Sequence, residues 1–211
     1  MEHRKLYSSQ RLQRNNSVLI VEGPFAAEQL RSLHMHTGLK TFRTPEDQQR
    51  ALEDIAALPE GRIIVSRDGD TIVGYVTFHY PDEREPWGEA RMEDLIEFGA
   101  IEVASGYRSL GLGKEMLKLA FAHNQMEDVI VFATEYCWYW DLDHSKLSAS
   151  EYRNMTEQLM ACVDMVRYET DDPEICSHPA NCLMVRIGRH VPFTSIERFD
   201  RIRLRKAFMY D

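Results

Sequence analysis

The 211-residue sequence predicts an α/β (α+β) fold, in which a mixed, mostly antiparallel sheet has helices on both faces. Two observations predict it. The first is a hairpin, because apolar, β-branched runs over residues 62–67 and 71–80 enclose Asp68-Gly69-Asp70, and an Asp-Gly pair is a strong signal for a tight turn between strands. The second is a strand, turn, helix and strand in succession over residues 94–134, which implies a crossover within the sheet.

The elements before the hairpin are shorter. Residues 18–22 are β-branched and predict a strand, and the apolar residues within 24–33 are compatible with a helix. Thr44 followed by Pro45 predicts an N-cap with proline at the first helical position. That helix should extend to about Leu58, with four residues facing inward: Ala51, Leu52, Ile55 and Ala56.

The second half of the chain continues the mixed pattern. A strand over 94–103 leads through a turn at 104–110 to a helix over 112–123, and residues 129–134 form a buried strand. We expect a helix over 150–163, a strand over 165–169, and a helix that starts at Asp172-Pro173 and ends at Gly188 as its C′ glycine. Residues 196–210 fit a helix in part and a strand in part.

Composition narrows the classes of function. The net charge of −9 argues against broad nucleic-acid binding and suits a positively charged substrate. There is no apolar stretch long enough for a signal segment or a membrane span, so a cytoplasmic protein without membrane association is expected. Cys176, His178 and Cys182 could be imagined as metal ligands, but no CxxC pair is present, and we expect free thiols and no metal.

The most informative segment for function is the turn at 108–114, whose sequence is Arg108-Ser109-Leu110-Gly111-Leu112-Gly113-Lys114. Its glycines let the backbone approach a ligand, and the first amides of the following helix have no partner within the helix. Such a helix start binds anions, and a pyrophosphate suits it. A Walker loop would need glycine where Arg108 stands, and a Rossmann turn would need glycine at Met116. The alternative to a ligand site is a glycine turn that serves packing only.

The RxxGxG pattern after a long strand resembles the coenzyme-A-binding motif of the GCN5-related N-acetyltransferase (GNAT) superfamily, over about residues 45–190. The resemblance implies a GNAT-like fold, acetyl-CoA as co-substrate and backbone contacts to its pyrophosphate. The implied cofactor-binding residues are Ile101, Val103, Arg108, Ser109, Leu110, Gly111, Leu112, Gly113 and Lys114. Residues 180–188 look like the family's late helix, in which Met184 stands where the family often has a tyrosine acid. Tyr136, Tyr139 or water would then protonate the departing thiolate.

Two carboxylates on the strand over 94–103 are candidate bases, because an amine must lose its proton before it attacks a thioester. Glu97 precedes Arg108 by eleven residues, the spacing of the catalytic glutamate in the superfamily's histone acetyltransferases. By alternation Glu97 shares a face with Gly99, Ile101 and Val103, whereas Glu102 projects from the opposite face. Glu97 is the first choice and Glu102 the second, and solvated surface charges are the alternative.

The aromatic run over 134–141 has two interpretations. It could line an acceptor tunnel, or it could fill the core beneath the helix over 150–163.

Four longer segments, 58–82, 92–114, 125–142 and 174–188, resemble the family of bacterial acetoin utilization acetyltransferases (AcuA). The resemblance implies acetylation of a lysine of acetyl-CoA synthetase, which switches that enzyme off. A small-molecule amine acetyltransferase and a non-catalytic acetyl-CoA-binding regulator remain as alternatives. We expect an N-terminal extension over residues 1–42 packed on the domain, and an acetyltransferase domain over 43–211 with an elaborated C-terminal part.

Overall fold

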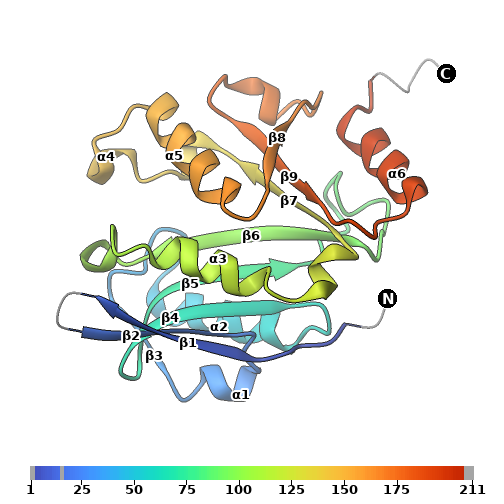
Figure 1. Cartoon of the computed structure of the whole chain (residues 1–211). Helices are drawn as coiled ribbons and strands as arrows, with labels where there is room; N and C mark the ends of the chain where they lie inside the picture. The colour runs from blue at the N-terminus through green and yellow to red at the C-terminus, as the bar shows by residue number, and fades with distance from the viewer. Residues whose placement is uncertain (1–2, 15–16, 207–211) are drawn as a thin grey trace. The chain divides into compact units, whose positions relative to one another are not determined.

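The computed structural model describes residues 3–14 and 17–206, and they fall into two compact units. Within the described residues, the first unit holds 3–79 and 98–123, and the second holds 80–97 and 124–206. The strand β6 (Leu95–Val103) begins in the second unit and continues into the first. As predicted, the fold is mixed α/β, with a mostly antiparallel sheet and helices (Figure 1).

The first unit is built on the strand order β1-β2-β4-β5-β6, with β1 at Ser8–Arg14, β2 at Ser17–Gly23, β4 at Arg62–Asp68 and β5 at Thr71–His79. The pairs β1–β2, β2–β4 and β4–β5 are antiparallel, and the short strand β3 (His34–Met35) pairs with β5 in parallel. The hairpin predicted around Asp68-Gly69-Asp70 is confirmed, and Gly69 has a positive φ of 57°.

Helices cover both faces of this sheet. The helix α2 (Pro45–Ala57) has the predicted Thr44 cap, whose hydroxyl accepts a hydrogen bond from the Asp47 amide. With α1 (Ala27–Leu30), α2 packs on one face, where Leu52 and Ala56 join Ile63 and Val65 in the core. The helix α3 (Leu112–Ala120) packs against β2, β4 and β5 on the opposite face (Figure 1). It is three residues shorter than predicted.

The second unit has the strand order β6-β7-β9-β8, with β7 at Ile130–Glu135, β8 at Val166–Tyr168 and β9 at Cys182–Ile187. β6 and β7 pair in parallel from Leu95↔Ile130 to Glu97↔Phe132, and β9 pairs antiparallel with both β7 and β8. Its core stacks Trp87 on Phe132 with ring centroids 5.0 Å apart. The helices are α4 (Leu142–Ser145), α5 (Ala149–Ala161) and α6 (Phe193–Arg203).

The helix predicted from Asp172-Pro173 to Gly188 is wrong. A single 3₁₀ turn, Ile175–Ser177, is followed by the buried strand β9. The run Cys182–Ile187 is apolar and lies hydrogen-bonded between two strands, so its backbone groups are satisfied by neighbours rather than within a helix. Gly188 fits because a side chain there would meet the Glu127 backbone at 2.4 Å, so it serves close packing and not a helix end.

The identification of Met184 with a helical tyrosine position is therefore wrong as well, since Met184 is a buried strand residue paired with Ala133.

The C-terminal segment, for which the sequence fitted both a helix and a strand, is helical over α6, and the part of it over residues 207–210 lies outside the described residues. Residues 8–14, 17–23 and 34–35 form β1, β2 and β3 of the first unit's sheet. The division of the chain at residue 42 stays a prediction.

Candidate active site

The predicted anion-binding turn joins β6 to α3 within the first unit. The Ala104 amide at the end of β6 donates to Val73 O at 2.9 Å and holds the strand end on β5. A 3₁₀ turn, Ser105–Tyr107, follows, and Arg108 Nε donates back to Val103 O at 3.1 Å. The chain therefore leaves the sheet in a fixed direction before it reaches the glycines.

Two residues of the turn adopt the left-handed conformation. Ser109 has φ 65°, which is uncommon for a residue with a side chain, and Gly111 has φ 79°. A Cβ placed on Gly111 would have no atom within 4 Å, so open space lies beside the backbone there. The left-handed Gly111 directly precedes the right-handed helix, and such a pair of conformations turns successive amides toward one side, which forms a concave site for an anion.

The start of α3 completes this concave site. Gly111 is the N-cap residue, and no side chain caps the helix. The amides of Leu112, Gly113 and Lys114 are the first of the helix and have no intrahelical acceptor, and they lie at the positive end of its dipole. Ser109, Gly111 and Lys114 are exposed. A diphosphate fits this turn, because open space and unpaired donors occur together.

The opposite face of α3 is anchored in the core, as its pattern predicted. Leu112, Met116, Leu117 and Ala120 are buried, and Phe121 lies edge-on to Phe78 with ring centroids 5.7 Å apart. The helix start is therefore held rigidly, which favours an anion site whose amides are already oriented.

Within β6 the predicted alternation of faces is wrong. A Cβ on Gly99 would collide with His79 Nε2 at 2.5 Å, and Ala100 packs on the core cluster that contains Tyr75. Gly99 and Ala100 thus face the same side, as at a β-bulge. Val103 faces the other side, because a Cβ on Gly74 would meet Val103 Cγ2 at 3.2 Å.

The consequence concerns the candidate residues of this strand. Gly99 shares a face with Glu102, and Ile101, by alternation after the bulge, shares one with Val103. The pattern that grouped Glu97 with Ile101 and Val103 does not continue through Gly99, because strict period-two counting fails where one residue is inserted.

Glu102 is 6% exposed, and three donors bind its carboxylate. Oε1 accepts from the amides of Lys40 and Thr41 at 2.9 and 2.8 Å, and Oε2 accepts from the Tyr75 hydroxyl at 2.8 Å. Burial and the negative charge of Glu102 raise the pKa of Tyr75. These contacts use Glu102 to fasten the 40–41 segment to the sheet.

Glu97 is half-buried and is the last β6 residue in the register with β7, opposite Phe132. Its catalytic role stays a prediction.

The aromatic run after β7 divides between surface and interior. Tyr136 stacks on Trp138 with ring centroids 4.9 Å apart, and residues Trp138 and Tyr139 are 48% and 60% exposed. Trp140 instead stacks on Tyr152 of α5. Burial is the main cause that raises the pKa of Tyr136, followed by the charge of Glu174, so its hydroxyl is protonated at neutral pH.

Sequence reasoning missed Glu135, the last residue of β7. Trp140 Nε1 donates to its Oε2 at 2.9 Å, and burial raises the pKa of Glu135 to about 7. Opposite it in the register, burial and then the charge of Glu135 raise the pKa of the Cys182 thiol to about 12. The available signal was an acidic residue that ends an otherwise apolar strand. A carboxyl group that titrates near neutral pH is a candidate for proton transfer.

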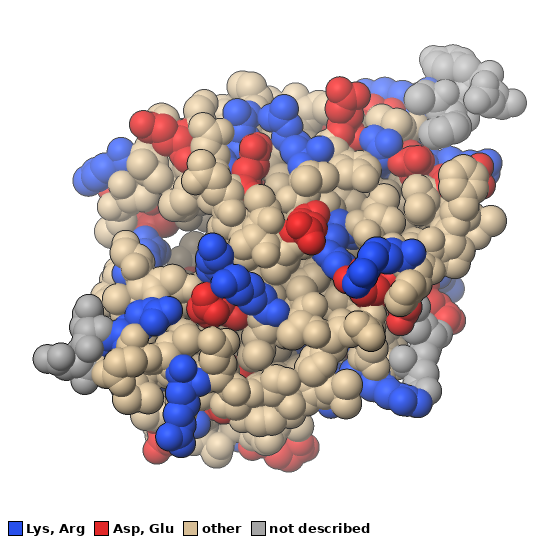
Figure 2. All heavy atoms as spheres, in the orientation of Figure 1, with Lys and Arg blue, Asp and Glu red and all other residues tan. Residues whose placement is uncertain are grey.

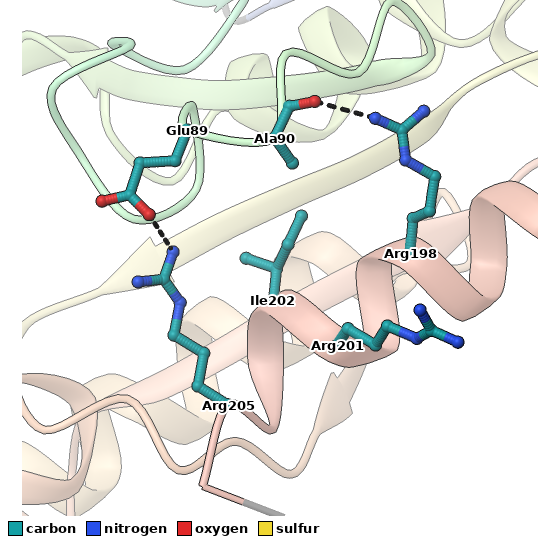
Figure 3. Close-up of a pocket in the computed structure, with 6 residues that line it drawn as sticks. All are labelled: Glu89, Ala90, Arg198, Arg201, Ile202 and Arg205. Carbon is teal, nitrogen blue, oxygen red and sulfur yellow. Dashed lines mark hydrogen bonds and ion pairs between the residues drawn. The ribbon is translucent and has the colours of Figure 1, made fainter. Parts of the chain in front are cut away.

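A pocket in the second unit lies beside α6 (Figure 3). Arg205 Nη2 pairs with Glu89 Oε2 at 2.9 Å, Arg198 Nη2 donates to Ala90 O at 2.8 Å, and Ile202 lies between them. These contacts hold the 86–90 loop on α6 and on Arg205, which follows the helix. Among the described residues there is no group of three potential metal ligands, and no helix long and apolar enough to cross a membrane.

Charges of both signs are interspersed on the face that shows α3 (Figure 2). The net charge of −9 therefore does not form one acidic field on that face.

Comparison with known proteins agrees with this geometry. The model of the acetyltransferase (GNAT) family matches residues 27–136. The chain is 51% identical over 210 residues to the acetoin utilization protein AcuA of Bacillus subtilis and 49% identical to that of Bacillus licheniformis, with complete coverage of both chains in each case. The crystal structure of an acetoin utilization protein from Exiguobacterium sibiricum superposes with a TM-score of 0.96 at 45% identity, covering 99% of each chain.

Proposed function

This chain belongs to the GNAT family of acetyltransferases, and we propose that it transfers the acetyl group of acetyl-CoA to a lysine of acetyl-CoA synthetase and thereby inactivates that enzyme. The family relationship makes it an acetyl-CoA-dependent acetyltransferase. The protein acceptor and the effect on it are the proposed part.

One observation carries the choice of acceptor. The chain is 51% identical, over its whole length, to a protein named for acetoin utilization, and the likeness includes the C-terminal part beyond the family match at residue 136. The acceptor's chemistry is consistent with switching off an enzyme, because acetylation removes the ammonium charge of a lysine and its hydrogen-bond donors. The reaction would belong to the control of acetoin and acetate catabolism by protein lysine acetylation.

The first role of the protein is to bind the coenzyme. The amides of residues 109–114 would hold the diphosphate, with the open space at Gly111 admitting it. The backbones of Ile101 and Val103 would hold the pantetheine arm, and a strand amide near Ile101 would stabilise the oxyanion.

The second role is proton transfer. Glu97 would take a proton from the lysine ammonium, and the neutral nitrogen would attack the thioester carbonyl. The carbon–sulfur bond then breaks, the nitrogen releases its second proton to solvent as the amide forms, and the thiolate accepts a proton from Tyr136, Tyr139 or water. The raised pKa of Tyr136 keeps its hydroxyl protonated at neutral pH but makes it a weaker proton donor to the thiolate. We place the reaction in the cytoplasm, where thiols such as the four free cysteines stay reduced.

The test is incubation of purified acetyl-CoA synthetase with labelled acetyl-CoA and this protein, followed by peptide mapping and a synthetase assay. We expect one labelled lysine, loss of synthetase activity in proportion to label, and no transfer by Glu97→Gln. Label on free polyamines or amino acids but none on the synthetase would establish a small-molecule acetyltransferase instead. Synthetase inhibition without label would establish a non-catalytic regulator.

A further inference from the structure

The strand β1 runs between contacts with the two ends of the helix that follows the glycine turn. Arg14, its last residue, donates through Nε to Leu110 O at 3.0 Å, just before α3 begins. Ser8, its first residue, lies 3.1 Å from His123 Nε2, just after α3 ends. The N-terminal strand, which no coenzyme motif includes, is thus fixed beside the coenzyme turn.

The Arg14 bond acts on the most unusual backbone of the turn. Leu110 stands between the left-handed residues Ser109 and Gly111, so its carbonyl orientation depends on both. A positive φ is unfavourable for serine, and surrounding contacts must maintain it. A charged donor to Leu110 O holds the peptide in the orientation in which the amides of the turn face outward.

The remainder of the guanidinium is available for a ligand. Its Nη1 donates to Gln13 O at 3.0 Å, and no carboxylate pairs with Arg14 among the described residues. A planar cation with donors to spare, next to unpaired helix amides, matches the geometry of phosphate oxygens.

We propose that Arg14 is a positioning residue for the phosphate groups of acetyl-CoA, so that the N-terminal strand β1 forms part of the coenzyme site. This inference depends on the coenzyme binding of the proposed function, though not on the identity of the acceptor. The Nε donor fixes the turn, and the positive charge attracts the diphosphate.

The experiment measures coenzyme A binding by calorimetry for the wild type, Arg14→Ala, Arg14→Lys and the control Ser8→Ala, with thermal unfolding of each. Loss of a charged hydrogen bond predicts roughly 10- to 100-fold weaker binding for Arg14→Ala. Its Kd should also depend less steeply on salt, because one cation fewer meets the phosphates. Arg14→Lys should restore the salt dependence but not the full affinity, because lysine lacks the planar fork. Ser8→Ala removes the contact at the other end of β1 and should bind within about twofold of the wild type.

A kinetic comparison separates a positioning role from a merely structural one. Acetyl-CoA and S-acetylpantetheine share the thioester, and only acetyl-CoA has phosphates. Arg14→Ala should raise KM for acetyl-CoA, leave kcat unchanged and leave S-acetylpantetheine turnover at the wild-type level. Equal losses with both thioesters, or coenzyme binding equal to that of Ser8→Ala, would overturn the inference. A wild-type protein that does not bind coenzyme A would instead remove the proposed function.

Discussion

The Tyr75 hydroxyl donates a 2.8 Å hydrogen bond to Glu102, whose other carboxylate oxygen accepts the Lys40 and Thr41 amides. Glu102→Gln should therefore lower the free energy of unfolding by about 1–3 kcal/mol, because an amide cannot replace a charged acceptor of three donors. Urea unfolding measures this, and Tyr75→Phe in a double-mutant cycle should show coupling between the two side chains. Unchanged stability with abolished turnover would instead identify Glu102 as the base.

Glu97→Gln should reduce kcat by roughly 10²–10⁴, the range expected when a general base is lost. Acetyl-CoA affinity should stay within about twofold of the wild type, because Glu97 lies outside the amide cluster at 109–114. Steady-state kinetics with calorimetry measures both quantities. Glu102→Gln is the control on the same strand, and it should retain kcat in its folded fraction. Similar losses of kcat in the two variants would contradict the assignment.

Gly111→Ala should weaken acetyl-CoA binding by roughly tenfold or more, because its Cβ enters the open space beside the turn. Gly69→Ala is a matched control, since Gly69 also has a positive φ and open space around it, but it lies in the β4–β5 turn. Both variants should lose about 1 kcal/mol of stability through the same backbone strain. Equal coenzyme binding by the two variants would show that the space at Gly111 receives no ligand.

Glu135→Gln should make the second unit more stable above neutral pH. The pKa of Glu135 is raised from 4.5 to about 7 in the folded state, so the folded state binds more protons than the unfolded state between these values. Stability from this group is present below pH 4.5 and falls as the pH rises toward 7. The difference between the two pKa values of Glu135 corresponds to at most about 3 kcal/mol in the free energy of unfolding. Thermal unfolding from pH 4 to 8 measures it.

Glu127 supplies the control of opposite sign in the same unit. Its pKa is lowered to about 2, first by the Arg189 amide bond and also by bonds from the Arg189 and Arg186 side chains. Its stabilisation is present above pH 4.5 and is lost as the pH falls toward 2. Glu127→Gln should therefore destabilise the protein at neutral pH, and the stability of this variant should fall less steeply as the pH is lowered from 4.5 toward 2. Identical pH profiles for Glu127→Gln and Glu135→Gln would refute both assignments.

The sequence predicted correctly those elements that depend mainly on neighbouring residues. Thr44 with Pro45, the Asp68-Gly69-Asp70 turn and the apolar face of the helix at 112–120 appear where expected, because caps, turns and periodic faces depend on neighbouring residues. The helix predicted over 172–188 was wrong, because whether an apolar run forms a strand or a helix depends on the available partners, and the partner strand β7 is distant in sequence.

By itself, the sequence determined the strand, glycine turn and helix start that favour a coenzyme diphosphate, since φ preferences and helix-end amides are properties of a short segment. Only the tertiary structure decided that Glu102 is held by Tyr75, that Glu135 titrates near neutral pH and that Arg14 reaches Leu110. The physical reason is that burial, pKa and long-range hydrogen bonds depend on residues brought together by folding, and Arg14 and Leu110 are 96 positions apart in the chain.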